Sequence, residues 1–213
     1  MDIFPASDRS LLISFGDEIS LAHHREVARL TQALVGTRGI LNLHPAFTTL
    51  LIDFDPRLLY HEAVESIVRE RMHQAEAAPP AQSRTVEIAV RFGGEFGPDL
   101  NDVATNAGLD PRAVIDCFCA AGYEVYFVGF STCFPYLGGL PRDLATPRLS
   151  APRKLVPQGS VAIAGSQAGI YPLASPGGWR LIGRTALRLF DPTAEPPPLL
   201  RMSDRVVFRP EAS

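Results

Sequence analysis

Four basic side chains lie between residues 141 and 157, and their chemistry suits the binding of an anion. A single acid, Asp143, accompanies them; the four are Arg142, Arg148, Arg153 and Lys154. Guanidinium groups bind carboxylates and phosphates through paired hydrogen bonds and stabilise negative charge that develops during a reaction. We therefore take Arg148 and Arg153 as candidate catalytic residues. The alternative is a solvated basic loop whose path is fixed by its prolines.

A carboxylate and several aromatic rings add to this candidate site. Glu95 and Asp99 could each act as a general base or a metal ligand, and we take Glu95 as the candidate catalytic carboxylate. The alternative for Asp99 is that it caps a helix. Phe134 and Tyr136 are candidate substrate-binding residues, because aromatic rings beside a few polar groups are typical of ligand pockets. Trp179 fits either such a pocket or the core of the fold.

Glycine pairs next to these residues allow the backbone to approach a ligand closely. They occur at Gly93-Gly94 and at Gly138-Gly139. We include Gly138 and Gly139 among the candidate substrate-binding residues; the alternative is a pair of tight turns. The glycines and prolines from residue 129 to residue 140 predict a loop of fixed shape, and such loops commonly carry binding residues.

Composition excludes several classes of function. The net charge of -3 and pI near 5.9 argue against nucleic-acid binding. The longest apolar runs are too short to span a bilayer, and no secretory signal is visible, so we expect a cytoplasmic protein. All five histidines precede residue 80, which excludes a histidine-based triad or metal site confined to the later part of the chain. No Walker-type phosphate loop occurs, and the three cysteines do not form a disulfide framework or a strong zinc pattern.

Periodicity divides the chain into two domains, residues 1–83 and 84–213. In the first, apolar residues alternate in short strands and recur at helical spacing in two longer segments. The order strand, helix, strand, strand, helix, followed by a strand at Val86–Val90, predicts a ferredoxin-like α+β domain. Residues 77–83, rich in alanine and proline, are expected to form a linker.

The second domain is expected to begin with two short helices and to continue in strands and turns only. Asp99 and Gly108 bracket the first helix, and Asp110-Pro111 opens the second. The many short strands that follow predict a barrel or a sandwich. The fold class is therefore α+β.

Two long motifs carry a resemblance to a known family. They are the segment Phe92–Leu100, which reads FGGEFGPDL, and the glycine- and proline-rich segment of residues 129–140. With further matches along nearly the whole chain, the sequence resembles the B subunit of 5-oxoprolinase, a carboxyltransferase-domain family also called KipI-like or allophanate hydrolase subunit 1. Gln167 and Tyr171 lie in matching segments, and this makes them candidate substrate-binding residues for an amide.

The resemblance implies a cyclophilin-like β-barrel as the second domain. It also implies a non-autonomous protein that acts with two partners, a second cyclophilin-like subunit of the C type and a lactam-binding subunit of the A type. Such a complex opens 5-oxoproline to glutamate with ATP and its magnesium, held by this chain or by a partner. Two alternatives come with the resemblance: inhibition of a sensor histidine kinase, and a role in a urea or amide carboxylase-hydrolase system.

The sequence departs from the family pattern at two places. Phe118 stands where the family usually has histidine, and Thr132-Cys133 replaces a proline-glycine pair. An apolar ring cannot transfer a proton as imidazole can. The departures leave two interpretations open, a member that has lost its chemistry and a histidine that only orients a loop.

Overall fold

The computed structural model describes residues 1–76, 83–129 and 131–211. The chain divides into two compact units, which we call the N-terminal unit (Met1–Gln82) and the barrel unit (Ser83–Ser213). Most of the linker expected at 77–83 lies outside the described residues. Within the described ranges, none of the helices combines the length and the apolar character needed to cross a bilayer.

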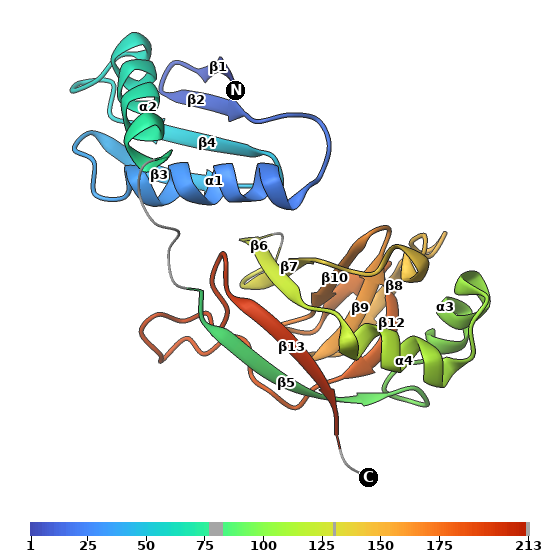
Figure 1. Cartoon of the computed structure of the whole chain (residues 1–213). Coiled ribbons are helices and arrows are strands. Elements are labelled where there is room, and N and C mark those ends of the chain that lie inside the picture. Colours follow the sequence, from blue (N-terminus) through green and yellow to red (C-terminus); the bar gives the residue numbers. More distant parts are fainter. Residues whose placement is uncertain (77–82, 130, 212–213) are drawn as a thin grey trace. The chain divides into compact units, whose positions relative to one another are not determined.

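The N-terminal unit is a four-stranded antiparallel sheet with two helices (Figure 1). The strand order across the sheet is β1-β2-β4-β3. The elements are β1 (Asp2–Ser7), β2 (Ser10–Ser14), α1 (Leu21–Leu34), β3 (Ile40–Pro45), β4 (Thr49–Phe54) and α2 (His61–Glu76).

Strict alternation decides which face of this sheet is buried. Along β4, Leu50, Ile52 and Phe54 are fully buried while the residues between them are half-exposed. The buried side chains pack against the apolar stripes of α1 and α2. Ser20 caps α1 by accepting a hydrogen bond from the backbone N–H of His23, as its residue type predicts.

The expected ferredoxin-like order is not what the sheet shows. The strand expected to complete it, Val86–Val90, lies within β5 (Thr85–Phe92), which pairs with β12 and β13 in the barrel unit. The outer position of the N-terminal sheet is taken instead by β1, which forms a hairpin with β2. A short hairpin is a local contact, and alternation alone does not say which sheet a strand joins. The α+β class itself is confirmed.

The barrel unit closes seven strands in the order β10-β7-β6-β13-β5-β12-β9. Only the β13–β5 pair is parallel. The strands not yet given are β6 (Tyr123–Gly129), β7 (Phe134–Gly138), β9 (Ser160–Ala164), β10 (Gln167–Ile170), β12 (Arg180–Arg184) and β13 (Arg205–Pro210). Two helices, α3 (Leu100–Ala107) and α4 (Pro111–Ala120), begin and end close to the expected residues. The expected barrel is thus confirmed.

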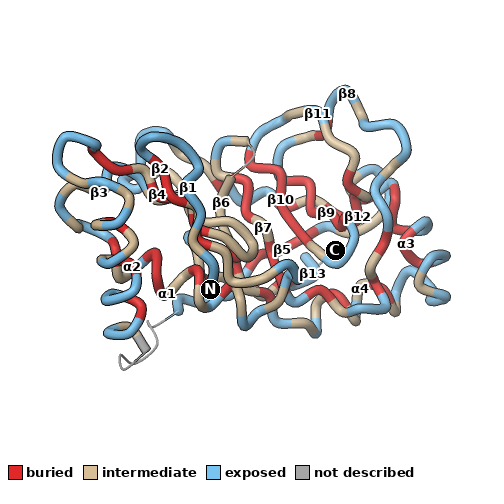
Figure 2. Tube along the Cα trace, turned by 90° about the horizontal axis from the view of Figure 1, so that it is seen from above, coloured by how far each residue is buried: buried red, intermediate tan, exposed pale blue. Residues whose placement is uncertain are grey.

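Smaller elements complete this unit. A short 3-10 helix, η1 (Arg142–Leu144), follows β7, and β8 (Arg153–Val156) pairs with β11 (Ser175–Gly177) in a two-stranded sheet. Figure 2 shows that the buried residues follow the barrel strands β9 and β10.

β7 was expected to be a loop and is a barrel strand. It pairs with β6 from Phe134 to Gly138, but with β10 only through Tyr136 and Leu137. Pro135, which has no N–H to donate, therefore lies where the strand has a ladder partner on one side only. The prolines and glycines that suggested a loop are compatible with a strand at this position.

Candidate functional site

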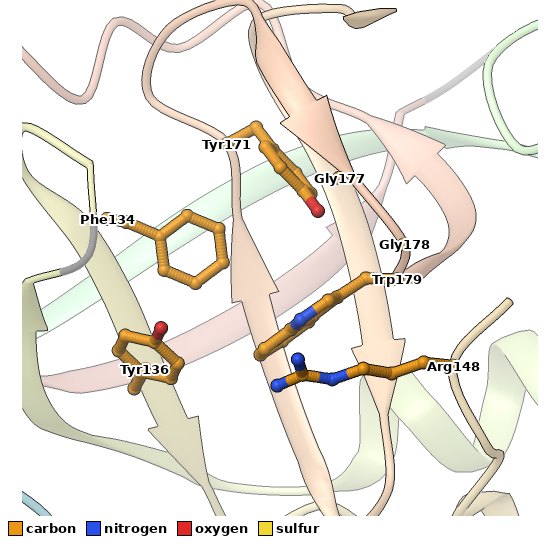
Figure 3. A pocket seen from close by; sticks show the side chains of 7 residues that line it. All are labelled: Phe134, Tyr136, Arg148, Tyr171, Gly177, Gly178 and Trp179. Atoms are coloured by element: carbon orange, nitrogen blue, oxygen red, sulfur yellow. The ribbon is translucent and has the colours of Figure 1, made fainter. Parts of the chain in front are cut away.

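An open cavity of about 90 Å³ lies in the barrel unit, and its wall is mainly aromatic (Figure 3). The lining comes from β7, from the segment after η1, from the end of β10 and from the segment that joins β11 to β12. The lining residues are Phe134, Tyr136, Arg148, Tyr171, Gly177, Gly178 and Trp179.

The aromatic rings hold one another in edge-to-face contacts. The centroid of the Phe134 ring lies 5.2 Å from that of Tyr171 and 5.3 Å from that of Trp179, at interplanar angles of 84° and 78°. Tyr136 contacts Trp179 at 5.8 Å. Edge-to-face pairs add about 0.5 to 1.5 kcal/mol each beyond area burial, so the rings stabilise one another in this arrangement. It brings together three of the predicted site residues.

Glycines make room for these rings. A Cβ atom on Gly169 would lie 2.7 Å from Cζ of Phe134 and 2.9 Å from Cζ3 of Trp179. One on Gly177 would collide with the hydroxyl of Tyr171. The sequence reasoning did not place Gly169, Gly177 or Gly178 in the site. The signal available was the Gly177-Gly178 pair directly before Trp179.

Arg148 is the basic residue of the 141–157 segment that reaches the cavity. Its guanidinium carbon lies 5.7 Å from the centroid of the Trp179 ring. In Figure 3 the side chain extends along Trp179 toward Tyr136. An arginine held against an indole by the ring quadrupole keeps its N–H donors available for an anion.

Arg153 has a different position from the one predicted. Its Nη2 donates to Oδ1 of Asp99 at 2.7 Å, and Nη1 donates to the carbonyl of Trp179 at 3.5 Å. It does not line the cavity. Arg153 therefore contacts the main chain next to the aromatic wall. Of the two candidate arginines, only Arg148 is placed to contact an anion in the cavity.

Asp99 connects the start of α3 to β12. Its Oδ2 accepts the backbone N–H of Leu181 at 2.7 Å, and its own N–H donates to the carbonyl of Leu181 at 2.9 Å. It makes no side-chain capping bond to α3, contrary to the simpler expectation. Only 5% of the residue is exposed. Asp99 and Arg153 together fix the chain segment that carries Trp179.

The remaining predicted site residues lie outside the cavity lining. Glu95 is exposed in the turn between β5 and α3, and Gln167 is half-buried at the start of β10. Gly138 is required by packing, because a Cβ there would collide with the ring of Tyr126. Gly139 has φ of +97° and abuts the carbonyl of Gly122. For both glycines, chain packing accounts for the residue type.

The two tyrosines of the wall are neutral hydrogen-bonding groups near pH 7. Burial raises the pKa of Tyr171, and the backbone N–H of Trp179 donates to its hydroxyl. Burial also raises the pKa of Tyr136, an effect that the nearby positive charge of Arg148 partly offsets. The wall can thus donate hydrogen bonds to a carbonyl without acting as a base.

Two of the thiols are shifted away from the reactive thiolate form. Burial raises the pKa of Cys119 to about 11, and it raises the pKa of Cys133 as well, so neither sulfur is an activated nucleophile. Within residues 1–76, 83–129 and 131–211, His, Cys, Asp and Glu form no group of three or more that could hold a metal ion.

Cys133 occupies a backbone conformation that favours glycine. Its φ is +63°, in the left-handed region. This is the position where the resemblance implies glycine, and side chains there cost about 1 to 2 kcal/mol. We expect Cys133→Gly to raise the free energy of unfolding by about 0.5 to 1 kcal/mol, after the extra entropy of glycine in the unfolded chain. Urea denaturation would measure it, and a loss of stability would show that the thiol contributes to packing.

Known proteins share this architecture. A family model described as carboxyltransferase domain, subdomain C and D, matches residues 1–200. The B subunit of 5-oxoprolinase from Escherichia coli O157:H7 is 42% identical over 205 residues, covering 96% of this chain and 93% of its own length. The B subunit of 5-oxoprolinase from Bacillus subtilis is 41% identical, covering 94% and 89%.

Solved structures agree with these matches. The crystal structure of TTHA0988 superposes with a TM-score of 0.85 at 36% identity, over 97% of this chain and 41% of that chain. This chain thus spans about two fifths of TTHA0988. Kluyveromyces lactis urea carboxylase, at 21% identity and a TM-score of 0.78, shows the same fold in 22% of its chain. From the family model and the two bacterial relatives together, this chain belongs to the family of 5-oxoprolinase B subunits, which are carboxyltransferase-domain proteins.

Proposed function

We propose that this chain is one component of an ATP-dependent 5-oxoprolinase, a hydrolase that opens 5-oxoproline to glutamate. The observation that carries the proposal is the match to three proteins named as the B subunit of 5-oxoprolinase, at 38% to 42% identity over nearly their whole length. The barrel, in the cyclophilin-like form that the resemblance implies, presents one side of the active site. A C-type cyclophilin-like partner and an A-type lactam-binding partner complete the complex in the cytoplasm.

The cavity supports a binding role for this chain rather than a self-sufficient catalytic one. Its lining offers one cation, two neutral tyrosine hydroxyls and aromatic surface, but no carboxylate, histidine or activated thiol. Such a set can position a small amide and donate hydrogen bonds to its carbonyl oxygen. It cannot remove a proton from water. The general base therefore comes from a partner, and we regard the isolated chain as inactive.

ATP does not fit this cavity. The lining carries a single cation, Arg148, whereas a nucleoside triphosphate presents several negative charges and is far larger than this small cavity. No Walker-type loop is present in the sequence. We therefore place the nucleotide and its magnesium outside the aromatic cavity.

The test is reconstitution. This chain is co-expressed with candidate A-type and C-type partners, and glutamate and ADP are both measured with 5-oxoproline and ATP supplied. We expect glutamate and ADP to form only when all three chains are present. If the complex assembles yet forms no glutamate, or if the two partners suffice without this chain, the proposal is wrong.

A further inference from the structure

The arginines around the aromatic cavity differ in whether a carboxylate pairs with them. Arg153 is paired with Asp99, and Arg180 is paired with Asp102 through an Nη1–Oδ2 contact of 2.6 Å. Arg148 has no carboxylate within ion-pair distance among the described residues, and it is the one of the three that lines the cavity. The cavity therefore carries one positive charge that no acid of the described chain neutralises.

The surroundings of Arg148 limit which ligands can reach its guanidinium group. Arg148 is exposed, but its guanidinium lies against Trp179 and points along the ring toward Tyr136, so the aromatic wall bounds one side of it (Figure 3). The cavity of about 90 Å³ is open on one side, so a small ligand can enter it while its outer part stays accessible to a partner protein. One uncompensated cation in a small aromatic cavity favours a small, flat ligand with a single anionic group.

We propose that Arg148 is a specificity-determining residue, which binds the carboxylate of 5-oxoproline while the lactam ring lies among Tyr136, Tyr171 and Trp179. This inference rests on the proposed function and names the group by which the substrate is recognised. The role of Arg148 is recognition, since it contacts the carboxylate and not the amide that is hydrolysed. A phosphoryl group has similar chemistry toward arginine, so inorganic phosphate is needed as a separate probe.

The expected selectivity follows from charge-assisted hydrogen bonding. A hydrogen bond to a charged group contributes about 1.5 to 3 kcal/mol, which corresponds to about 10- to 150-fold in affinity. A lactam without a carboxylate loses this contact and leaves the guanidinium to the solvent. Because the ammonium group of lysine is a compact point charge, lysine at this position would replace the charge but not the paired donors of the guanidinium.

The chain supplies its own probe of this cavity. Trp179 is its single tryptophan, so fluorescence excited selectively in the indole band reports on the cavity wall. The full-length chain would be titrated with three ligands: 5-oxoproline, 2-pyrrolidinone, which is the same ring without the carboxylate, and inorganic phosphate. The variants are Arg148→Gln, Arg148→Lys and, as a matched control, Arg142→Gln. Arg142 is an exposed arginine of the same segment that does not line the cavity.

We expect the unmodified chain and Arg142→Gln to prefer 5-oxoproline over 2-pyrrolidinone by about 10- to 150-fold. Arg148→Gln should abolish the preference and leave 2-pyrrolidinone affinity unchanged, and Arg148→Lys should restore only part of it. A preference that survives in Arg148→Gln, no response to 5-oxoproline, or an Arg148-dependent affinity for phosphate alone would overturn the inference. Because this titration needs no partner and no ATP, its failure is distinguishable from failure of the reconstituted activity.

Discussion

Asp99→Ala should lower the free energy of unfolding of the barrel unit by about 3 kcal/mol, because it breaks a buried ion pair on one side only. The substitution removes the partner of Arg153 and leaves the N–H of Leu181 without its side-chain acceptor. Arg153 is itself largely buried, with 28% of its side chain exposed, so water compensates its charge only in part. Urea denaturation followed by Trp179 fluorescence would measure the change.

Two further variants separate charge from shape at Asp99. Asp99→Asn keeps an oxygen for the N–H of Leu181 while it removes the charge, and we expect a loss of about 1 to 2 kcal/mol. Asp102→Ala breaks the ion pair with Arg180. Because the Asp102 side chain is 59% exposed, this change should lower the free energy of unfolding by less than about 1 kcal/mol. If Asp99→Ala cost no more than Asp102→Ala, the assigned role of Asp99 in holding the segment of Trp179 would be wrong.

Phe118→His, the change toward the residue that the resemblance implies, should destabilise the barrel unit by about 3 kcal/mol. Phe118 is fully buried, and its ring contacts those of Phe92, Tyr123 and Phe208. An imidazole there would lose part of this packing and would bring polar nitrogens into an apolar cluster. Phe118→Leu, which stays apolar, should cost about 1 kcal/mol and serves as the matched control.

The loss of folding stability caused by Phe118→His should depend on pH. An imidazole buried in an apolar cluster has its pKa below the ordinary value of about 6.5, so below that pH the unfolded chain binds a proton that the folded chain does not. Stability then falls as the pH falls, by up to about 1.4 kcal/mol per pH unit. Denaturation curves at pH 8 and pH 5.5 would show the difference, which the leucine control should lack. Equal stability of Phe118→His and the unmodified chain would show instead that the imidazole finds a partner, as expected of a site residue.

Much of the local structure follows from the sequence. Helical spacing of Val27, Leu30 and Leu34 marks the buried stripe of α1, and Asp110-Pro111 marks the start of α4 through the cap and the proline. These features depend on neighbours in the chain. The assignment of β5 to the barrel cannot be derived from such neighbours, because β5 pairs with β13, which lies more than a hundred residues later in the chain. Periodicity carries no information about such partners.

The candidate site, too, could be predicted only in part from the sequence. Residue type suggested that Phe134, Tyr136 and Arg148 belong to a ligand site, and the family resemblance added Tyr171. The structure places all four around one cavity. Residue type alone could not distinguish Arg148 from Arg153, since the difference is a contact with Asp99 over fifty residues away. The roles of Gly169 and Gly177 were equally hidden, because each is explained by an aromatic ring that only the folded chain brings close.

The most direct test is a crystal structure of the three-protein complex with 5-oxoproline bound. We expect lactam density in the cavity of this chain, with the ring against Trp179 and the carboxylate on the guanidinium of Arg148. If 5-oxoproline lies wholly on the partner proteins while the cavity of Phe134, Tyr136 and Tyr171 contacts neither lactam nor product, the proposed binding role of this chain is contradicted.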